Sequence, residues 1–549
     1  MSEKIEIYDA VVIGAGFSGI YMLYRLRDVL GMNATVVEGS DGIGGTWHHN
    51  RYPGARCDTE AYIYCFSFDD ELLQDWEWSG RYPEQEELHR YLNHVVDRFD
   101  LRRDIQLQTR IVEATWNDET GRWDLLSEDG RHLRSNFIIT GVGLLSVGHV
   151  PSLNGLDRFE GEWYHTASWP AEGVDFSGKR VGVIGTGSTG VQCVPVIAET
   201  AAHLTVFQRT PQYAVPAHHE KVDRAYLENV KKDYDTVLNI ARWSAGGFPW
   251  EPSKVSALEV SSNERLETYE ALWEEGGFRF LYGSYRDIFL DRRANDTASE
   301  FIRAKIRAVV KDPILAEQLL PVDHPFGARR PIVESGYFET FNRDNVALVD
   351  VRLFPIENVT PTGVQTTIEH HQIDVLVFAT GFDAVTGPFM KMNIKGRDTV
   401  RLTDKWANGP ETYLGLSVHG FPNFFMVTGP GSTFGNAPVV IEHHVEWIAA
   451  LLQHMHSSDI DQVEATKTAE QSWGRHVDEL GQKSLVALAD SWFTGANIPG
   501  KPKAFFFYPG SFGGYRRMAE QCADDGYPGF ESHGTELSSQ PLPVKDIAQ

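Results

Sequence analysis

Two glycine-rich turns, each between an apolar strand and an amphipathic helix, constrain the fold of this chain more than any other feature. In the first, residues 8–13 form an apolar run, three spaced glycines follow, and a helix is predicted over residues 20–30. Gly14 permits a tight turn, Gly16 lets a pyrophosphate approach the backbone, and Gly19 lets helix and strand pack closely. The start of such a helix presents unpaired N–H groups and a positive dipole end to phosphates. We therefore predict a dinucleotide-binding unit here.

The same pattern recurs further along the chain. An apolar strand over residues 179–184 leads into Gly185, Gly187 and Gly190, and a helix is predicted through residue 196. One such turn alone would be weak evidence, but two in one chain indicate two nucleotide cofactors.

The residue that ends the next strand differs in charge between the two units. Glu38 lies 38 − 14 = 24 residues after Gly14, and Arg209 lies 209 − 185 = 24 residues after Gly185. A carboxylate at this place accepts hydrogen bonds from a ribose diol, whereas a guanidinium clamps a ribose 2′-phosphate. We therefore expect FAD at the first unit and NADPH at the second.

The cysteines exclude one familiar use of two dinucleotides. Disulfide reductases carry a redox cysteine pair near the flavin, but Cys57, Cys65, Cys193 and Cys522 form no C-x-x-C pair and no metal-ligand cluster. We expect free thiols in a reducing cytosol and no metal site. The electrons must leave the flavin by another route.

Length and charge limit the partners of this chain. A chain of 549 residues exceeds the size at which one core keeps growing, so two or three domains are expected. The net charge of −26 argues against nucleic acid or an anionic membrane, because both need a basic face. The charged start and the short apolar runs predict neither a signal peptide nor a membrane span. We expect a cytoplasmic monomer or weak homo-oligomer.

The stretch between the two units indicates the chemistry. Residues 159–170 read F-E-G-E-W-Y-H-T-A-S-W-P. Here the chain resembles the Baeyer–Villiger monooxygenases, whose fingerprint is F-x-G-x-x-x-H-x-x-x-W followed by Pro or Asp. All four fixed positions match, at Phe159, Gly161, His165 and Trp169. Trp169 favours the ketone branch, because related N- and S-oxygenating enzymes usually carry a different aromatic residue there.

Further segments extend the resemblance over nearly the whole chain, in the expected order. Residues 44–47 and 51–58 look like the second signature of the family, on the flavin side. Residues 326–331 resemble the segment that holds the active-site arginine, and 374–382 the strand that returns to the flavin domain. Residues 491–500 resemble the mobile segment that closes over the nicotinamide cofactor.

The resemblance implies a reaction and two central residues. In the family, NADPH reduces FAD, O2 adds at flavin C4a, and the flavin C4a-peroxide attacks a ketone to give an ester or lactone. Such a site must stabilise a developing oxyanion and exclude water. We predict Arg330 for this role, because arginine keeps its charge and presents donors in a fixed fork. Asp58 would orient Arg330 as the counterion of a partly dry pocket.

The resemblance also supplies candidates for cofactor binding. Arg209, Thr210 and Arg329 would surround the 2′-phosphate, with Arg329 standing where the family often has Lys. Trp492 would contact the nicotinamide-side ribose. The further NADP candidates are Gly185, Thr186, Gly187, Ser188, Thr189, Gly190 and Gln192, and the FAD candidates are Gly14, Gly16, Phe17, Ser18, Gly19, Glu38, Gly45, Thr46, Trp47, Arg56, Asp58, Tyr64, Ile111 and Ala437.

Two histidine features have other expectations. His165 and Trp169 precede the second apolar strand at a domain junction, so we expect a structural and conformational role for them. His48 and His49 stand where the family commonly has aromatic residues, and they predict a different polarity near the flavin. A metal role is not expected for them, because adjacent side chains seldom converge on one ion.

These segments predict an α/β fold with two Rossmann-like dinucleotide-binding domains, one for FAD and one for NADP. The FAD domain would comprise residues 1–145 and 383–549, and the NADP domain residues 150–220 and 330–382. Residues 221–329 have a helical pattern without strand alternation and would form an insertion in the NADP domain. Two crossing connections allow a hinge, since hydride transfer and oxygenation need different occupants beside the flavin.

Three other functions stay open at this point. They are an N- or S-oxygenating flavin monooxygenase, an NADPH oxidase that releases hydrogen peroxide, and a dinucleotide-binding regulatory protein without turnover. Retention of both Arg330 and Asp58 speaks against the last. Cyclic, aromatic, linear and steroid ketones all remain candidate substrates, with O2 as the second.

Overall fold

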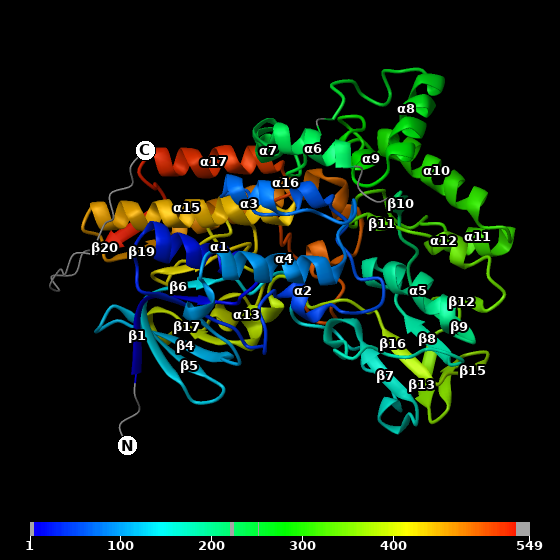
Figure 1. Ribbon diagram of the computed structural model, residues 1–549, viewed down its shortest axis with the longest axis horizontal. Coiled ribbons are helices and arrows are strands. Elements are labelled where there is room, and N and C mark those ends of the chain that lie inside the picture. The colour runs from blue at the N-terminus through cyan, green and yellow to red at the C-terminus, as the bar shows by residue number, and fades with distance from the viewer. Residues whose placement is uncertain (1–4, 220–223, 251, 534–549) are drawn as a thin grey trace.

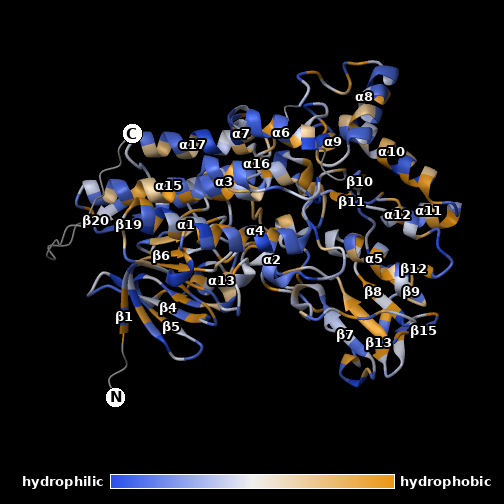
Figure 2. Cartoon of the chain, in the orientation of Figure 1, coloured by the Kyte–Doolittle hydropathy of each residue, from blue (hydrophilic) through white to orange (hydrophobic). Residues whose placement is uncertain are grey.

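The computed structural model describes residues 5–219, 224–250 and 252–533, and it has the predicted α/β architecture. Figure 1 shows two sheets side by side, with the helices of the chain's C-terminal part above the first sheet and a group of helices projecting above the second. In Figure 2 the central strands β1, β6 and β8 are largely coloured hydrophobic, while the outer helices α8, α10 and α17 alternate between both colours. The strands therefore form the apolar interior, and the outer helices carry polar residues (Figure 2).

The first sheet carries the first glycine turn. Its central strand β1 is buried along residues 10–13 and pairs in parallel with β2 and β6, as buried apolar strands do in parallel sheets. The order is β17-β4-β5-β6-β1-β2-β3, and β18 also pairs with β6. The strands are β1 (Ile5–Ile13), β2 (Ala34–Val37), β3 (Ile105–Gln106), β4 (Ile111–Asn117), β5 (Arg122–Ser127), β6 (His132–Thr140), β17 (Asn393–Lys395) and β18 (Phe424–Met426).

Helix α1 follows the first turn and packs against the long, buried helix α15. It begins at Phe17, three residues earlier than predicted, and passes at Arg25 into a π-helical turn that ends at Val29. The elements around this sheet are α1 (Phe17–Tyr24), α2 (Thr46–His49), α3 (Asp70–Asp75), α4 (Gln85–Arg98), α13 (Gly387–Lys391), α14 (Leu402–Lys405), α15 (Ala437–Ser457), β19 (Gln462–Ala465), α16 (Lys467–Lys483), α17 (Phe512–Asp524) and β20 (Phe530–His533).

The second sheet carries the second glycine turn. All its strands run parallel in the order β12-β9-β8-β16-β7, and the turn lies at the carboxyl end of its middle strand β8. Beside it lie helices α5 and α12 and a small antiparallel sheet. The elements are β7 (Glu162–His165), β8 (Arg180–Ile184), α5 (Ser188–Thr200), β9 (His203–Gln208), α12 (Tyr337–Thr340), β12 (Val346–Asp350), β13 (Ile356–Thr360), β14 (Gly363–Thr366), β15 (His370–Gln372) and β16 (Val375–Phe378).

The insertion is helical in the described residues, as predicted. The parallel pair β10 and β11 closes its base, so the chain leaves and re-enters the second domain at one place. None of the helices in the described part of the chain combines the length and apolarity that a membrane span requires. The insertion comprises α6 (Arg224–Lys232), α7 (Tyr234–Trp243), α8 (Ser262–Glu275), α9 (Arg279–Tyr282), α10 (Arg292–Val309) and α11 (Pro313–Leu319), and β10 (Ala214–Pro216) and β11 (Ile332–Glu334) flank it.

Two connections run between the sheets, and they pair with each other. Gly148 on the outgoing connection and Phe382 on the returning one form an antiparallel bridge. The N–H of His149 donates to the carbonyl of Gly381 at 2.9 Å. We call these two paired connections the hinge.

Candidate active site

The first glycine turn has the shape of a phosphate cradle. Gly14 has a φ of +105°, and a Cβ there would lie 2.6 Å from the carbonyl oxygen of Gly141. A Cβ on Gly19 would lie 1.8 Å from the carbonyl oxygen of Gly14. On the open side, a Cβ on Gly16 would meet only Gly45, at 3.6 Å or more. The start of α1 faces this opening, so the residues present fit a pyrophosphate.

Glu38 lies across the mouth of this turn. Its Oε2 accepts the N–H of Ala15 at 2.8 Å, and its Oε1 accepts the N–H of Ser40 at 2.9 Å. The carboxylate is therefore held by backbone groups on both sides. Oε1 also accepts the Ser40 hydroxyl at 2.8 Å, so Oε2 is the oxygen that keeps a lone pair for a ribose hydroxyl.

Most flavin-side candidates come together beside the first turn. The Trp47 and Tyr64 rings meet edge to face at 5.7 Å, and the Phe17 ring lies 5.5 Å from that of Tyr64. Gly45 caps the start of α2, and Thr46 is the first residue of that helix. Together these aromatic rings form one wall beside the glycine opening.

Three flavin candidates lie further out or have other partners. The Arg56 side chain forms an ion pair with Glu84 at 3.2 Å, which occupies the guanidinium. Ile111 is buried at the start of β4, and Ala437 is the first residue of α15. Their contacts with FAD stay predictions.

The second turn repeats the cradle. Gly185 has a φ of +112°, and a Cβ there would lie 2.4 Å from the carbonyl oxygen of Ala379. A Cβ on Gly190 would lie 2.2 Å from the carbonyl oxygen of Gly185. A Cβ on Gly187 would meet no described atom within 4 Å, so the space above it is open. This space fits a second pyrophosphate.

Two cations stand together beyond the second turn. Arg209 is exposed after β9, and its side chain forms no hydrogen bond or ion pair within the described residues. The buried Nε of Arg329 also lacks a hydrogen-bond partner there. Burial lowers the pKa of Arg329, Asp323 opposes this, and Arg209 lowers the pKa further. Two neighbouring guanidinium groups without a direct ion pair in the described residues fit a 2′-phosphate. Thr210 lies next to Arg209, and its carbonyl accepts the Thr186 hydroxyl at 2.9 Å.

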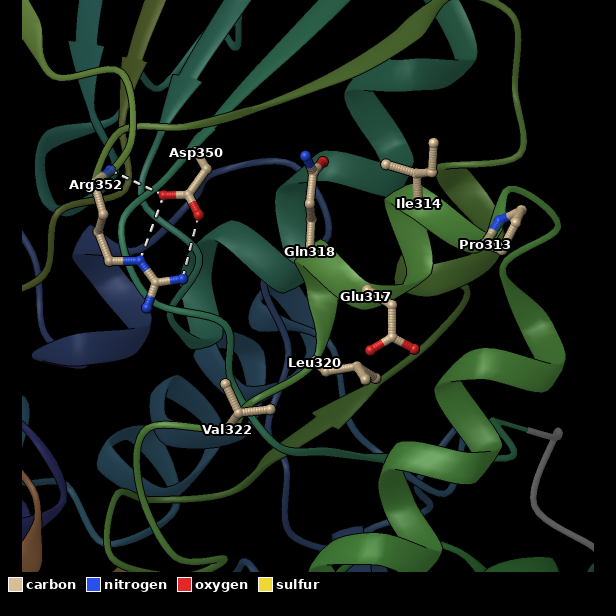
Figure 3. A pocket seen from close by; sticks show the side chains of 8 residues that line it. All are labelled: Pro313, Ile314, Glu317, Gln318, Leu320, Val322, Asp350 and Arg352. Carbon is tan, nitrogen blue, oxygen red and sulfur yellow. Dashed lines mark hydrogen bonds and ion pairs between the residues drawn. The ribbon is translucent and has the colours of Figure 1, made fainter.

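A hollow of about 520 Å³ lies at the same edge of the second sheet. Helix α11 and the end of β12 bound it, and β12 pairs with β9 through Asp350 and Gln208. In Figure 3, Asp350 and Arg352 face each other at one side of the hollow and Ile314 stands at the other. Because β9 leads directly to Arg209, the hollow flanks the 2′-phosphate candidates.

Arg330 and Asp58 meet where the two units approach each other. Nη1 of Arg330 donates to Oδ2 of Asp58 at 2.6 Å, and the side chains are 27% and 5% exposed. Burial lowers the pKa of Arg330, but the attraction of Asp58 outweighs burial and raises that pKa above its usual value. Within the described chain, Nε and Nη2 of Arg330 form no hydrogen bond. Two donors are therefore left for a bound group.

Side chains of helix α5 connect this pair to the second turn. Nε2 of Gln192 donates to Oδ1 of Asp58 at 3.0 Å, while its Oε1 accepts the Tyr52 hydroxyl at 2.8 Å. Arg330 Nη1 also approaches Oγ of Ser188 at 3.4 Å, and Thr189 follows Ser188 on the first turn of α5. Gln192, predicted as a cofactor residue, contacts Asp58 here.

Aromatic residues of the insertion surround Arg330, and none of them stands out in the sequence. The guanidinium carbon lies 5.2 Å from the ring centre of Phe278. Phe248 stacks on Tyr282 at 4.7 Å and lies 5.5 Å from Phe278. The aromatic density of residues 276–282 was the available signal, but a helical pattern does not tell which helix faces the site.

Of the fingerprint residues, His165 lies at the hinge, whereas Phe159 and Gly161 lie near Asp374 at the other end of β7. His165 ends β7, and its ring lies 6.3 Å from that of Phe382. Burial lowers the pKa of His165. Trp169 packs on Tyr164, and a Cβ on Gly161 would lie 2.6 Å from the ring of Phe159. These contacts agree with a structural role.

The segment around Trp492 rests on the hinge as well. Trp492 packs edge to face against Phe434 at 5.5 Å. Nδ2 of Asn497 donates to the carbonyl of Phe382 at 2.9 Å, and Nζ of Lys501 pairs with Oδ1 of Asp383 at 2.5 Å. The contact of Trp492 with the nicotinamide ribose stays a prediction.

The two adjacent histidines lie on α2. Nε2 of His48 pairs with Oδ1 of Asp41 at 2.8 Å, and Nδ1 faces the Arg51 guanidinium at 3.1 Å. His49 is exposed beside it. Their effect on the polarity near the flavin stays a prediction.

Known proteins share this arrangement. A family model described as FMO-like, flavin-binding monooxygenase-like, matches residues 8–224. A Baeyer–Villiger monooxygenase of Pseudooceanicola batsensis is 44% identical over 522 residues, which are 95% of each chain. The chain belongs to the Baeyer–Villiger monooxygenase family. This monooxygenase is thus an enzyme that uses FAD and NADPH.

Two further relatives bear on its fold and its substrate. A solved structure of cyclohexanone monooxygenase from Rhodococcus sp. Phi1 bound to NADP+ is 43% identical, with a TM-score of 0.95 over 97% of this chain and 100% of that one. It confirms the fold with two Rossmann-like domains. A phenazine N-monooxygenase of Lysobacter antibioticus is 43% identical over 534 residues, 97% of this chain and 98% of the relative.

Proposed function

We propose that this monooxygenase inserts one oxygen atom of O2 beside a ketone carbonyl, with Arg330 stabilising negative charge and Asp58 holding it in place. The overall reaction is ketone, O2, NADPH and H+ giving ester or lactone, NADP+ and water. The buried ion pair of Arg330 and Asp58 between the two turns, 2.6 Å long, carries the proposal. It leaves two guanidinium donors free at the place where the two cofactor sites meet.

Each residue of the pair has a separate task. Bound FAD, once reduced by NADPH, supplies the electrons that activate O2. Arg330 directs Nε and Nη2 at the oxygen atoms on which negative charge develops, and it requires no reorganisation to do so. Asp58 keeps the guanidinium oriented, and Gln192 holds the other oxygen of Asp58. The rings of Phe278 and Tyr282 keep water away from the reacting atoms.

The second turn selects the nicotinamide cofactor. Arg209 and Arg329 bind the 2′-phosphate, because they are neighbouring cations whose side chains form no hydrogen bond or ion pair within the described residues. The open space over Gly187 receives the pyrophosphate. NADH, which lacks the phosphate, would leave both guanidinium groups unpaired.

A panel of substrates tests the reaction. Purified enzyme with FAD and NADPH is incubated with cyclic, aromatic, linear and steroid ketones, and ester and hydrogen peroxide are quantified against NADPH consumed. We expect ester from at least one class, in amounts that match the NADPH consumed. Peroxide as the sole product with all four classes would contradict the proposal.

N-oxygenation is a second candidate, and the Lysobacter relative favours it. An aromatic amine nitrogen carries no carbonyl oxygen, so its oxygenation creates no oxyanion for Arg330 to stabilise. Phenazine and related heteroaromatic amines therefore belong in the same assay. N-oxides with no ester from any ketone would establish this second candidate instead of the first.

A further inference from the structure

A second buried carboxylate lies two residues beyond Asp58, and the mechanism above does not use it. Glu60 is 1% exposed. Its Oε1 accepts Nη2 of Arg81 at 2.6 Å and Nε of Arg279 at 3.2 Å, and its Oε2 accepts Nη2 of Arg279 at 3.3 Å. One carboxylate thus ties the flavin-side segment to helix α9 of the insertion.

This carboxylate is ionised. Burial raises the pKa of Glu60, but the charges of Arg279 and Arg81 outweigh burial and hold the pKa below its usual value. A buried ion pair adds little to stability compared with apolar residues of similar size. Its plausible value lies in fixing geometry, since removing one partner leaves a buried charge alone.

The geometry that Glu60 fixes is next to Arg330. Arg279 directly follows Phe278, whose ring lies 5.2 Å from the guanidinium carbon of Arg330. Asp58 pairs with Arg330 and Glu60 pairs with Arg279, so two carboxylate–guanidinium pairs flank the Phe278 ring. Because Phe278 directly precedes Arg279, a shift of the Phe278 backbone would stretch the pair between Arg279 and Glu60.

Arg279 also orders the aromatic wall beyond Phe278. Its guanidinium carbon lies 5.0 Å from the ring centre of Trp250. Trp250 stacks on Phe248 at 5.3 Å with an angle of 8° between the rings, and Phe248 contacts Phe278. The contacts of Arg279 therefore reach Phe278 by two routes, along the chain and through stacked rings.

We propose that Glu60 is a positioning residue for oxygen insertion: through Arg279 it holds Phe278 against Arg330 and so fixes the direction of the free Arg330 donors. The inference rests on the role proposed for Arg330. Loosening this support leaves electron transfer from NADPH intact but misdirects the donors. O2 then takes the two electrons and two protons, from NADPH and H+, and leaves as hydrogen peroxide instead of entering the ester.

Glu60→Gln tests this idea, because it keeps the shape of the side chain and removes its charge. In enzyme saturated with FAD we expect the anaerobic rate of FAD reduction and the KM for NADPH to stay within about twofold. The ester-to-peroxide ratio should fall between about 10- and 100-fold, the range that a small misplacement of reacting groups produces. The KM for the ketone should rise. Loss of packing alone would not separate the two substrates in this way.

Arg307→Gln is the matched control. Arg307 is an arginine of the same insertion, and it forms an exposed ion pair with Glu317 at 2.7 Å. It should leave the ester-to-peroxide ratio unchanged. A fall equal to that of Glu60→Gln would mean that breaking any ion pair made by the insertion has this effect, and would overturn the proposal.

Two more variants keep the test decisive. Arg279→Lys retains the positive charge but loses the forked guanidinium, so its ester-to-peroxide ratio should lie between those of wild type and Glu60→Gln. If Glu60→Gln does not fold, Arg279→Lys tests the proposal instead. Phe278→Leu should also lower the ratio, and combining it with Glu60→Gln should add little, because both act through one contact. Fully multiplicative effects would show that Glu60 acts elsewhere.

The outcomes also separate this inference from the proposed function. A wild-type ratio in folded, FAD-loaded Glu60→Gln overturns the role of Glu60 alone, provided that Arg330→Ala loses ester formation. Normal ester formation by Arg330→Ala would instead remove the proposed role of Arg330, and the inference with it.

Discussion

The two glycine turns have similar backbone geometry but differ in the charged side chains that we expect to bind the adenosine part of each cofactor. Both begin with a glycine of positive φ and both leave no space for a Cβ on their last glycine. At the first turn, Glu38 already accepts hydrogen bonds from Ala15 and Ser40. At the second, Arg209 and Arg329 are neighbouring cations, and neither side chain forms a hydrogen bond or ion pair within the described residues.

This difference matches two ways of holding a cofactor. The first turn satisfies its own charge, so its shape persists whether or not a ligand is bound. The second contains two neighbouring guanidinium groups that Asp323 and Asp490 influence without a direct ion pair, so an incoming phosphate would be their first direct partner among the described groups. Such a contrast suits one cofactor that stays with the protein and one that comes and goes.

Replacing a single turn glycine with alanine should have the largest effect on cofactor binding. Gly19→Ala places a Cβ 1.8 Å from a carbonyl oxygen, so strand and helix must separate. We expect the purified variant to contain almost no FAD, as measured by flavin absorbance per protein.

The added Cβ of Gly187→Ala meets no described atom within 4 Å, so the melting temperature of this variant should stay within about 2 °C of wild type. Its KM for NADPH should nevertheless rise, since only the cofactor occupies that space. A large loss of stability in Gly187→Ala would contradict this interpretation.

Arg330→Ala tests the role proposed for the arginine that lies between the two turns. It removes the free donors and leaves both cradles intact. Ester formation should fall at least about 100-fold, as for other losses of an oxyanion donor. Anaerobic reduction of FAD by NADPH should remain measurable in a stopped-flow instrument. A near wild-type rate of ester formation would disprove the assigned role.

Arg209→Ala tests whether the positive charge at the second turn binds the 2′-phosphate of NADPH. Losing a guanidinium contact with a phosphate should raise the KM for NADPH between about 10- and 100-fold. The KM for NADH should change little, because NADH has no 2′-phosphate to lose. Steady-state kinetics with both cofactors decide the matter, and equal changes would argue against the phosphate clamp.

The smallest expected effect concerns the stability of the flavin side. Glu442 on α15 is buried and accepts hydrogen bonds from Ser67, and burial, with the charge of Glu446, raises its pKa to about 7. A carboxyl whose pKa is raised by folding favours the folded state below its ordinary pKa and loses that contribution as pH rises through 7. Glu442→Gln should therefore raise the melting temperature by about 2–4 °C at pH 8 and not at pH 5. An equal gain at both pH values, in thermal unfolding followed by circular dichroism, would rule out titration of Glu442.

Much of the fold could be predicted because its signals are local. Strand β2 ends at Val37, directly before Glu38, close to the strand end expected from the sequence, since a short buried strand bounded by polar residues leaves little choice. The spacing of the turn glycines directly predicts the geometry of the two turns. The pairing of Arg330 with Asp58 came from resemblance to a family, because the two residues are 272 positions apart.

The support around that pair could not be predicted in the same way. Glu60 and Arg279 are 219 positions apart, and neither belongs to a spaced motif. A helical pattern showed that the insertion is helical but not that α9 would face the active site. Such contacts depend on how whole elements dock, and periodicity along one element carries no information about that.

The hydrogen bond from Asn497 to Phe382 has a mechanical consequence. The carbonyl that receives it belongs to one of the two paired connections of the hinge. We therefore predict that rotation of the NADP domain about the hinge also moves the segment around Trp492, so that domain rotation and closure of this segment are coupled.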